Sequence, residues 1–196
     1  MHVLAQLEFP TPRRWTYDEY YQLAGMGLFR DQYVVLVDGG IVVMPPKTEL
    51  HVAAVILATN AAERAFGSGF TVRSQFPLRA GESDEPQPDV AVVAGDVRQT
   101  LRSGRPTIAL LVIEVGDPTL AYDRREKSGM YGKAGIADYW IVNLVDCVVE
   151  VRRNPTADPH HLLGHRYDPP QIFGAGHQIH PLAMPSAAVC VDDLLP

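Results

Sequence analysis

The sequence is poor in the residues that stabilise secreted, membrane-spanning or zinc-bound proteins. Cys147 and Cys190 are its only cysteines, which excludes a disulfide scaffold and a cysteine-based zinc site. The longest apolar stretch, Ile108 to Val115, has the length of a strand and is too short to span a bilayer. The first residues, MHVLAQLEFPTPRRW, lack the basic start and apolar segment of a signal peptide. We therefore expect a cytoplasmic protein with no membrane segment.

Lysine and net positive charge are also scarce. Of the 17 basic residues only three, Lys47, Lys127 and Lys133, are lysines, and the formal net charge is −6. An acidic chain is not expected to bind duplex DNA tightly without a metal. It can still be a nuclease if carboxylates gather in one cleft and basic residues surround it. The few lysines reflect either chance or a need for an amine that can lose its proton.

The length and composition predict a single folding unit. A chain of 196 residues can bury one core and is short for two, and its 46% hydrophobic and 20% charged residues are typical of a globular protein. We predict one domain over residues 1–196, of the α/β (α+β) class, with a mixed β-sheet core flanked by helices. Its core should cover about residues 16–153, with a C-terminal hairpin and tail over 154–196.

Local signals predict the first elements. Thr16 and Glu19 have the spacing of a capping box and predict a helix that begins there. Asp38-Gly39 separates two β-branched runs and predicts a hairpin over residues 33–44. An Ala-rich helix is expected over about residues 50–66.

The later elements follow from apolar runs and a second capping-box spacing. We expect strands over residues 70–79, 89–93, 108–115, 138–144 and 147–152. Residues 95–105 are polar and leave room for a helical turn. Asp123 and Glu126 predict that a helix over residues 123–134 begins at Asp123.

Two carboxylates stand at expected strand ends. Glu114 lies near the end of the apolar 108–115 run, where an unpaired charge would be costly and would either neutralise or find a cation. An arginine partner and a solvated strand end remain open alternatives for Glu114. Asp89 follows Pro88 and opens a short strand, a position equally typical of a turn. Because catalytic side chains often converge at strand ends, we expect the two acids to lie together.

Lys127 is the third candidate. Lys127, Met130, Tyr131 and Ala134 fall on one face of the expected helix, so the lysine lies on or beside the face that packs on the sheet. The alternative is an exposed lysine paired with Asp123, four residues earlier. Two carboxylates can hold Mg²⁺ or Mn²⁺, and a nearby amine can orient or deprotonate a water or neutralise the transition state of phosphodiester hydrolysis.

These residues occur in the order of a known family. Pro88-Asp89, Glu114 and a later lysine resemble the PD-(D/E)xK nuclease superfamily, although its usual lysine position, two residues after the glutamate, is Gly116 here. The resemblance is closer to the Uma-type restriction endonuclease family, in which the lysine lies on the following helix. The matching stretches span roughly Tyr17 to Arg153 and are Val37-Asp-Gly, Met44-Pro-Pro, Gln87-Pro-Asp-Val, Val112-Ile-Glu-Val, Asp123-x-x-Glu-Lys127, Tyr131-x-x-Ala-Gly-Ile and Asp138-Tyr-Trp-Ile-Val.

The resemblance implies a restriction endonuclease-like fold and an Mg²⁺-dependent (or Mn²⁺-dependent) DNA endonuclease that is a homodimer. It implies that Asp89 and Glu114 are metal ligands, with the Val115 carbonyl as a third, and that Lys127 is the catalytic lysine. His51 matches a histidine often found at the start of the second helix and is an accessory candidate, although a histidine there is more often polar surface.

The chain also departs from the family. Val35 stands where the family commonly has a glutamate on the first hairpin strand, and Gly40 where another often follows the turn. The loss near Val35 removes a candidate ligand. A catalytically degenerate module that keeps the nuclease fold and binds nucleic acid or protein without turnover is therefore the rival hypothesis. Drift should erode the Asp89, Glu114 and Lys127 set, yet all three are present.

Overall fold

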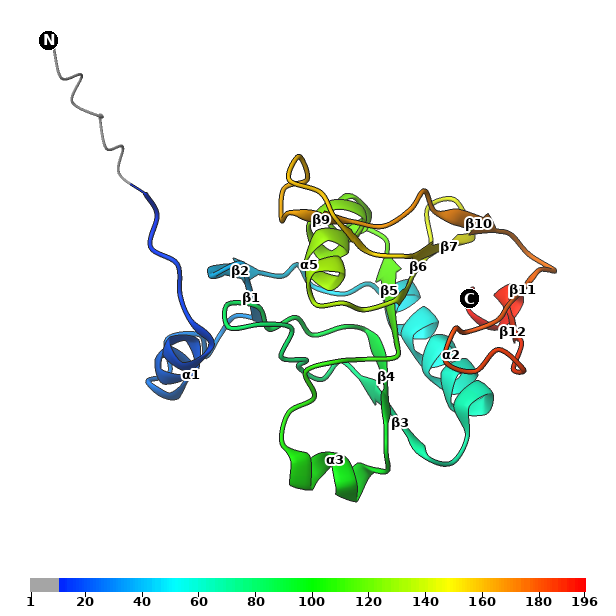
Figure 1. Cartoon of the computed structure of the whole chain (residues 1–196), viewed down its shortest axis with the longest axis horizontal. Helices are drawn as coiled ribbons and strands as arrows, with labels where there is room; N and C mark the ends of the chain where they lie inside the picture. The colour runs from blue at the N-terminus through cyan, green and yellow to red at the C-terminus, as the bar shows by residue number, and fades with distance from the viewer. Residues whose placement is uncertain (1–10) are drawn as a thin grey trace, which may run out of the picture.

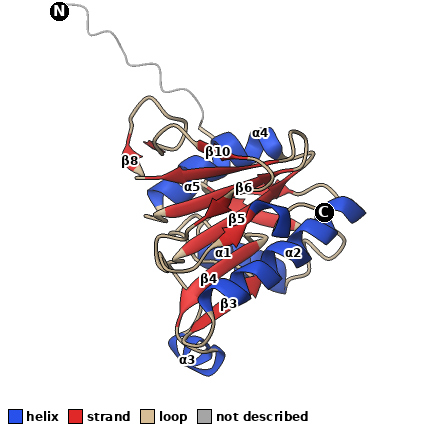
Figure 2. Cartoon of the chain, turned by 90° about the vertical axis from the view of Figure 1, so that its right-hand side faces the viewer, coloured by secondary structure: helices blue, strands red, loops and turns tan. Residues whose placement is uncertain are grey.

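A mixed β-sheet forms the centre of the computed structural model, which describes residues 11–196. Its six strands lie in the order β10-β7-β6-β5-β4-β3 (Figure 2); β5 and β6 are parallel and their neighbours antiparallel. The strands are β3 (Phe70–Ser74), β4 (Val90–Ala94), β5 (Leu111–Gly116), β6 (Asp138–Asn143), β7 (Val148–Arg153) and β10 (Gln171–Phe173). The predicted mixed sheet flanked by helices is confirmed.

The structure bears on the membrane prediction but not on most of the N-terminal one. Residues 1–10, which make up most of the segment predicted to lack a signal peptide, lie outside the described residues. Within residues 11–196, no helix is long and apolar enough to cross a membrane.

Small side chains let α2 (Glu49–Phe66) pack closely on one face of the sheet. Ala54, Ala58 and Ala62 are buried against it, and Thr48 caps the helix by accepting a hydrogen bond from the backbone of His51. The bulkier Ile56 points away from the sheet and is 56% exposed. Figure 2 shows α2 lying across the strands. Alanine permits the close approach because it places only one methyl group between helix and sheet.

The opposite face of the sheet is covered by a helix with an irregular middle. It runs through α4 (Leu120–Tyr122), the π-helical turn η1 (Asp123–Lys127) and α5 (Ser128–Lys133). Met130 and Tyr131 of α5 are buried against Val112 of β5 and Tyr139 of β6. One extra residue in a helical turn shifts the side chains that follow, and such turns are frequent at functional sites.

Asp123 does not begin this helix, so the capping-box prediction is wrong. The helix starts three residues earlier, at Leu120, and the Asp123 carboxylate accepts a hydrogen bond from Thr119 Oγ1 at 2.9 Å. From its position inside the helix, the carboxylate instead reaches Lys127, one turn further on. Asp123 has the spacing of a capping box with Glu126 and that of an i,i+4 ion pair with Lys127, so the sequence alone cannot separate the two roles.

The N-terminal elements agree with their local signals. In α1 (Tyr17–Gly25), the Thr16 side chain and the Glu19 side chain form the reciprocal hydrogen bonds of a capping box. Strands β1 (Val34–Val37) and β2 (Gly40–Val43) form the predicted hairpin. Asp38 and Gly39 have φ angles of 46° and 70°, the left-handed conformation that a two-residue turn of this kind requires.

One predicted strand is shorter than expected, and one predicted turn is a full helix. β3 ends at Ser74 because Gln75 turns the chain with a φ of 57°, and the stretch to Arg79 is a loop. Within the polar connection lies α3 (Val97–Ser103), which Asp96 caps by accepting hydrogen bonds from two backbone N–H groups. Figure 1 shows α3 beyond the ends of β3 and β4.

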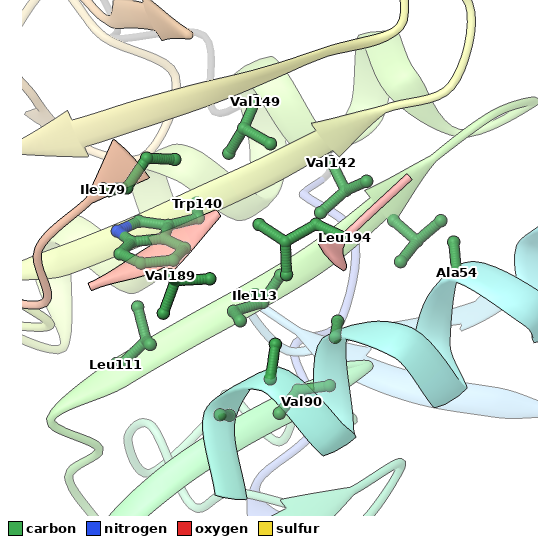
Figure 3. Packing of buried hydrophobic residues seen from close by; sticks show 14 of the residues in the cluster. Ala54, Val90, Leu111, Ile113, Trp140, Val142, Val149, Ile179, Val189 and Leu194 are labelled. Atoms are coloured by element: carbon green, nitrogen blue, oxygen red, sulfur yellow. The ribbon is translucent and has the colours of Figure 1, made fainter. Parts of the chain in front are cut away.

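Residues after 153 contribute to the main core. Ile179, Val189 and Leu194 are buried in the same cluster as Trp140 of β6 (Figure 3). Leu182 N–H also donates to the buried Asp138 carboxylate at 2.8 Å. The small elements of this region are β8 (Thr156–Ala157), β9 (His165–Arg166), β11 (Gln178–Ile179), β12 (Val189–Cys190) and the 3-10 turn η2 (Val191–Asp193). The C-terminal segment therefore covers the sheet beside α2.

Candidate active site

Asp89 lies directly before β4 and its carboxylate is held from two sides. The backbone N–H of Val115 donates to Asp89 Oδ2 at 2.9 Å, and His51 Nε2 lies 3.1 Å from Asp89 Oδ1. Burial alone favours the neutral acid, but the hydrogen bond from His51 and the charge of Lys127 outweigh it and lower the pKa of Asp89 to about 2. Asp89 is therefore an ionised carboxylate in a buried position.

Glu114 lies beside Asp89 because β4 and β5 are paired. Val90 pairs with Ile113, so the next residues outward on the two strands are Asp89 and Glu114. The backbone N–H of Asp89 donates to Glu114 Oε2 at 3.3 Å, and Tyr131 donates its hydroxyl to Oε1 at 2.6 Å. Glu114 is only 1% exposed. The strand ends thus bring the two predicted acids together.

Lys127 joins this pair from η1. Its ammonium lies 2.9 Å from Glu114 Oε2 and 2.9 Å from Asp123 Oδ1, and its side chain is only 10% exposed. The lysine therefore points inward, and the alternative of an exposed lysine is wrong, although the pairing with Asp123 is present. The bridge places a charge from the helix against the central strand.

Negative charge exceeds positive charge in this cluster. Burial, with the neighbouring Asp89 and Asp123, raises the pKa of Glu114 to about 8, although Lys127 opposes the rise. Burial alone lowers the pKa of Lys127, but Glu114 and Asp123 outweigh it and hold that pKa above its ordinary value. Lys127 thus remains an ammonium, and the excess carboxylate charge is relieved by a proton on Glu114.

His51, the accessory candidate, is part of this cluster rather than polar surface. It is 7% exposed, because the first turn of α2 lies over the strand ends. Its contact with Asp89 restrains the carboxylate that faces the pocket.

A small pocket opens at these residues. It has a volume of about 30 Å³ and is lined by Asp89, Lys127, His51, Lys47, Tyr33 and neighbouring residues of the 44–48 and 118–119 segments. That volume is enough for a water molecule or an ion of similar size. A wider hollow of about 580 Å³ adjoins it and shares Tyr33 and Lys47 as walls. Asp89 is therefore reachable from solvent through the side where Lys47 lies, whereas Glu114 lies behind it and lines neither hollow.

Three residues of the site were not singled out from the sequence as site residues. Lys47 Nζ lies 3.8 Å from Asp89 Oδ1 and 5.3 Å from the centre of the Tyr33 ring. Asp123 was expected as a helix cap, and Tyr131 only as a packing residue. The scarcity of lysine was the available signal for Lys47, and the i,i+4 spacing to Lys127 was the signal for Asp123.

The residues present fit a magnesium or manganese ion, although the donor set is small. Among residues 11–196 no group of three or more His, Cys, Asp or Glu side chains is arranged to hold a metal. Mg²⁺ usually takes only one or two carboxylates and keeps several waters, which the Asp89 and Glu114 pair beside a water-sized pocket can accommodate. Burial, with Asp89 and Asp123 nearby, raises the pKa of Glu114, and a divalent cation at this position would favour the ionised carboxylate.

The position of the missing family glutamate is apolar. Val35 pairs with Val42 across the hairpin and is 4% exposed. A carboxylate at this buried position would need a cation close by. The chain has no such acid at Val35, so Asp89, Glu114 and Asp123 supply the carboxylates of the site.

The sheet, its flanking helices and the cluster at the strand ends define an α+β protein with a nuclease fold. A solved structure of the same fold is that of a putative nuclease belonging to DUF820 from Anabaena variabilis ATCC 29413. The two structures superimpose with a TM-score of 0.67 at 14% sequence identity, over 91% of this chain and 96% of that one.

The chain belongs to the Uma2 family, described as "Putative restriction endonuclease", whose family model matches residues 17–190. The resemblance drawn from the sequence motifs is thereby confirmed. Among proteins with curated descriptions, none matches the chain significantly.

Proposed function

We propose that this protein is a metal-dependent endonuclease that hydrolyses phosphodiester bonds in DNA. The observation that carries the proposal is the meeting of Asp89, Glu114 and Lys127 at the ends of two central strands, with Lys127 Nζ 2.9 Å from Glu114 Oε2. Membership of the Uma2 family and the fold of the Anabaena nuclease support the reaction class.

Asp89 and Glu114, with the Val115 carbonyl, are the groups proposed to hold Mg²⁺ or Mn²⁺. The ion supplies polarisation of a phosphoryl oxygen and a more acidic bound water. His51 and the Val115 amide keep the Asp89 carboxylate ionised and oriented. Burial favours a proton on Glu114, and the carboxylate would have to release that proton to serve as a metal ligand.

The two lysines near the acids have different tasks in this proposal. Lys127 is tied to two carboxylates, so it fixes Glu114 in place and contributes a permanent positive charge to the site. Lys47 is less buried, with a side chain 28% exposed, and it borders both hollows. Lys47 is therefore the ammonium placed to contact a phosphate oxygen of the substrate.

Two further parts of the proposal do not come from the site itself, and of these the homodimer rests on the family alone. A homodimer would let two sites cut the two strands of a duplex, and sedimentation at micromolar protein concentration tests it. A cytoplasmic location is the setting in which such an enzyme meets cellular DNA.

The second candidate is a nuclease-fold module that binds but does not turn over. Val35 in place of a family glutamate favours it, since the carboxylate pair then lacks a third acidic ligand. The two candidates share the fold and differ in metal binding and hydrolysis.

Calorimetric titration of Mg²⁺ and Mn²⁺, alongside a plasmid-nicking assay, tests the proposal. The wild type is compared with Asp89→Ala/Glu114→Ala, with Lys127→Met, and with Glu63→Ala as a control, because Glu63 is an exposed carboxylate near the far end of α2. We expect the double variant to lose metal binding, Lys127→Met to lose nicking, and Glu63→Ala to match the wild type. Binding without nicking supports the second candidate, and no binding at millimolar metal removes the metal site altogether.

A further inference from the structure

Another hollow lies on the α3 side of the molecule, outside the acidic site. It has a volume of about 560 Å³ and is lined by Tyr17, Arg73, Val97, Thr100, Leu101, Gly104, Arg105 and Pro106. We call it the arginine groove. Its walls come from α1, β3, α3 and the loop that follows α3.

Two segments rich in arginine and free of acids meet at this groove. Residues 73–81 and 97–106 contain Arg73, Arg79, Arg98, Arg102 and Arg105, and neither segment contains Asp or Glu. They lie side by side, since Arg79 N–H donates to the Pro106 carbonyl at 2.9 Å. The fold therefore brings the positive charges of the two segments together on one side of the protein.

Among residues 11–196, most of these arginines have no carboxylate partner, whereas seven of the nine arginines outside the two segments do. Seven arginines outside the groove form ion pairs with carboxylates: Arg13, Arg14, Arg64, Arg124, Arg152, Arg153 and Arg166. Within the described part of the chain, Arg105 pairs with the buried Glu85, whereas no carboxylate lies within ion-pair distance of Arg73 or Arg79.

Aromatic rings hold these guanidinium groups in place. Arg79 lies over the Tyr17 ring at 4.4 Å and Arg105 faces the same ring at 5.6 Å, while Arg73 lies 5.4 Å from the Phe76 ring. Burial and the charge of Arg105 lower the pKa of Arg73, whose guanidinium lies at the hollow beside a like charge and without a carboxylate partner of its own among the described residues. A partly buried charge of this kind has a cost in stability.

The groove and the acidic site share one face of the sheet. Arg73 pairs with Ala91, and Ala91 pairs with Val112, so all three side chains project to the same face. Glu114 follows Val112 by two residues on β5 and projects to that face as well. Glu114 lies two strands away from Arg73, on β5, and two residues beyond Val112, the residue in register with Arg73. This offset places the two Cα atoms roughly 12 Å apart. One strand of DNA can span this distance well within a helical turn of about 34 Å.

We propose that the arginine groove binds the sugar–phosphate backbone of DNA and directs the strand toward Asp89 and Glu114. The identification of DNA as the ligand rests on the proposed function, whereas the location of the site rests on the arginines and aromatic rings of the groove. Arginine forks match phosphate oxygens in pairs, and the exposed Val97 and Leu101 give deoxyribose an apolar wall. Contacts of this kind position the backbone and carry no base sequence.

Fluorescence anisotropy with a labelled DNA duplex tests the groove without requiring cleavage. Binding is measured against salt concentration, once in EDTA and once in Ca²⁺, for the wild type and for Arg73→Gln/Arg79→Gln. Each lost phosphate contact lowers the salt dependence of log K by about one, so we expect the slope to fall by about two and the affinity to drop. The control, Arg64→Gln/Arg166→Gln, removes the same charge at exposed ion pairs and should match the wild type.

A second variant tests the groove in case the Arg73→Gln/Arg79→Gln protein does not fold. Leu101 is 82% exposed on the groove wall, so Leu101→Glu adds a negative charge there without removing a contact, and Leu162→Glu, at a side chain 64% exposed, is its control. We expect only Leu101→Glu to weaken binding. The groove proposal is overturned if the groove variants and their controls have equal affinities and equal salt slopes. It is also overturned if the wild type binds no duplex in either EDTA or Ca²⁺.

The two proposals can fail separately. A protein that nicks plasmid DNA with metal but binds it equally well without the groove arginines keeps the proposed function and loses the groove. A protein that binds through the groove and never cleaves keeps the groove and loses the endonuclease. An acidic-peptide site would appear as groove-dependent binding of polyglutamate without binding of DNA, and it too would overturn the DNA groove.

Discussion

Lys127 Nζ lies 2.9 Å from Glu114 Oε2, so a lysine on a π-helical turn reaches a carboxylate of a central strand. The same ammonium lies 2.9 Å from Asp123 Oδ1. Because two buried acids hold it, the lysine keeps its proton, and its pKa lies above the ordinary value. In the metal-free protein it is a fixed positive charge rather than a base.

Replacing Lys127 should destabilise the fold strongly. Lys127→Met leaves Glu114 and Asp123 buried without their cation, which typically costs about 3–5 kcal/mol of the free energy of unfolding. Arg64→Met is the control, because Arg64 pairs with Asp193 at 3.1 Å and both side chains are more than half exposed. Its loss should cost about 1 kcal/mol or less. Urea unfolding at neutral pH measures both, and equal losses would contradict a special role for the buried bridge.

The stability of the metal-free protein should decrease as the pH rises toward 8. Glu114 has an ordinary pKa of 4.5 and a folded pKa of about 8, so the folded state binds the proton more tightly. Its contribution is complete below the unfolded pKa and is lost as the pH passes through the folded pKa. Urea midpoints in EDTA between pH 5 and pH 8.5 should show this decline in the wild type and a flatter profile in Glu114→Gln. Parallel profiles for the two proteins would rule out Glu114 as the titrating group.

Lys47→Gln should change metal binding and DNA binding in opposite directions. Lys47 lies 3.8 Å from Asp89 Oδ1, so removing its charge should make Mn²⁺ binding about fivefold tighter, the equivalent of ~1 kcal/mol for a partly exposed pair. The same change should weaken DNA binding and nicking, because a phosphate contact is lost. Lys133→Gln carries the same change in net charge and should alter neither. A Lys47→Gln protein with weaker metal binding would show that the lysine supports the metal site instead.

The C-terminal segment should contribute to global stability. Leu194 is completely buried in the cluster that contains Trp140, so Leu194→Ala should lower the free energy of unfolding by about 2–5 kcal/mol. Leu162, 64% exposed, serves as the control, and Leu162→Ala should stay within about 0.5 kcal/mol of the wild type. Near-equal urea midpoints for the two variants would mean that the segment can leave the core without unfolding the sheet.

Asp89, Glu114, Lys127 and the accessory His51 were predicted from the sequence as site candidates, but most of their contacts were not. Asp89 and Glu114 stand out because each borders an apolar strand, and strand pairing places them side by side. Asp123 was misjudged, because its spacing to Glu126 fits a cap and its spacing to Lys127 fits an ion pair. His51 and Lys47 contact Asp89 across 38 and 42 residues of chain, and no local pattern encodes such contacts.

The sequence by itself determined the elements whose causes are local. The Thr16 capping box, the Asp38-Gly39 turn and the apolar run of β5 each depend on interactions within a few residues, so composition and spacing suffice. Only the tertiary structure decided which charges meet. The register of β4 on β5 sets Asp89 beside Glu114, and the π-helical turn aims Lys127 at them. Those distances depend on how whole elements pack, because the energy that fixes them comes from burying both faces of the sheet.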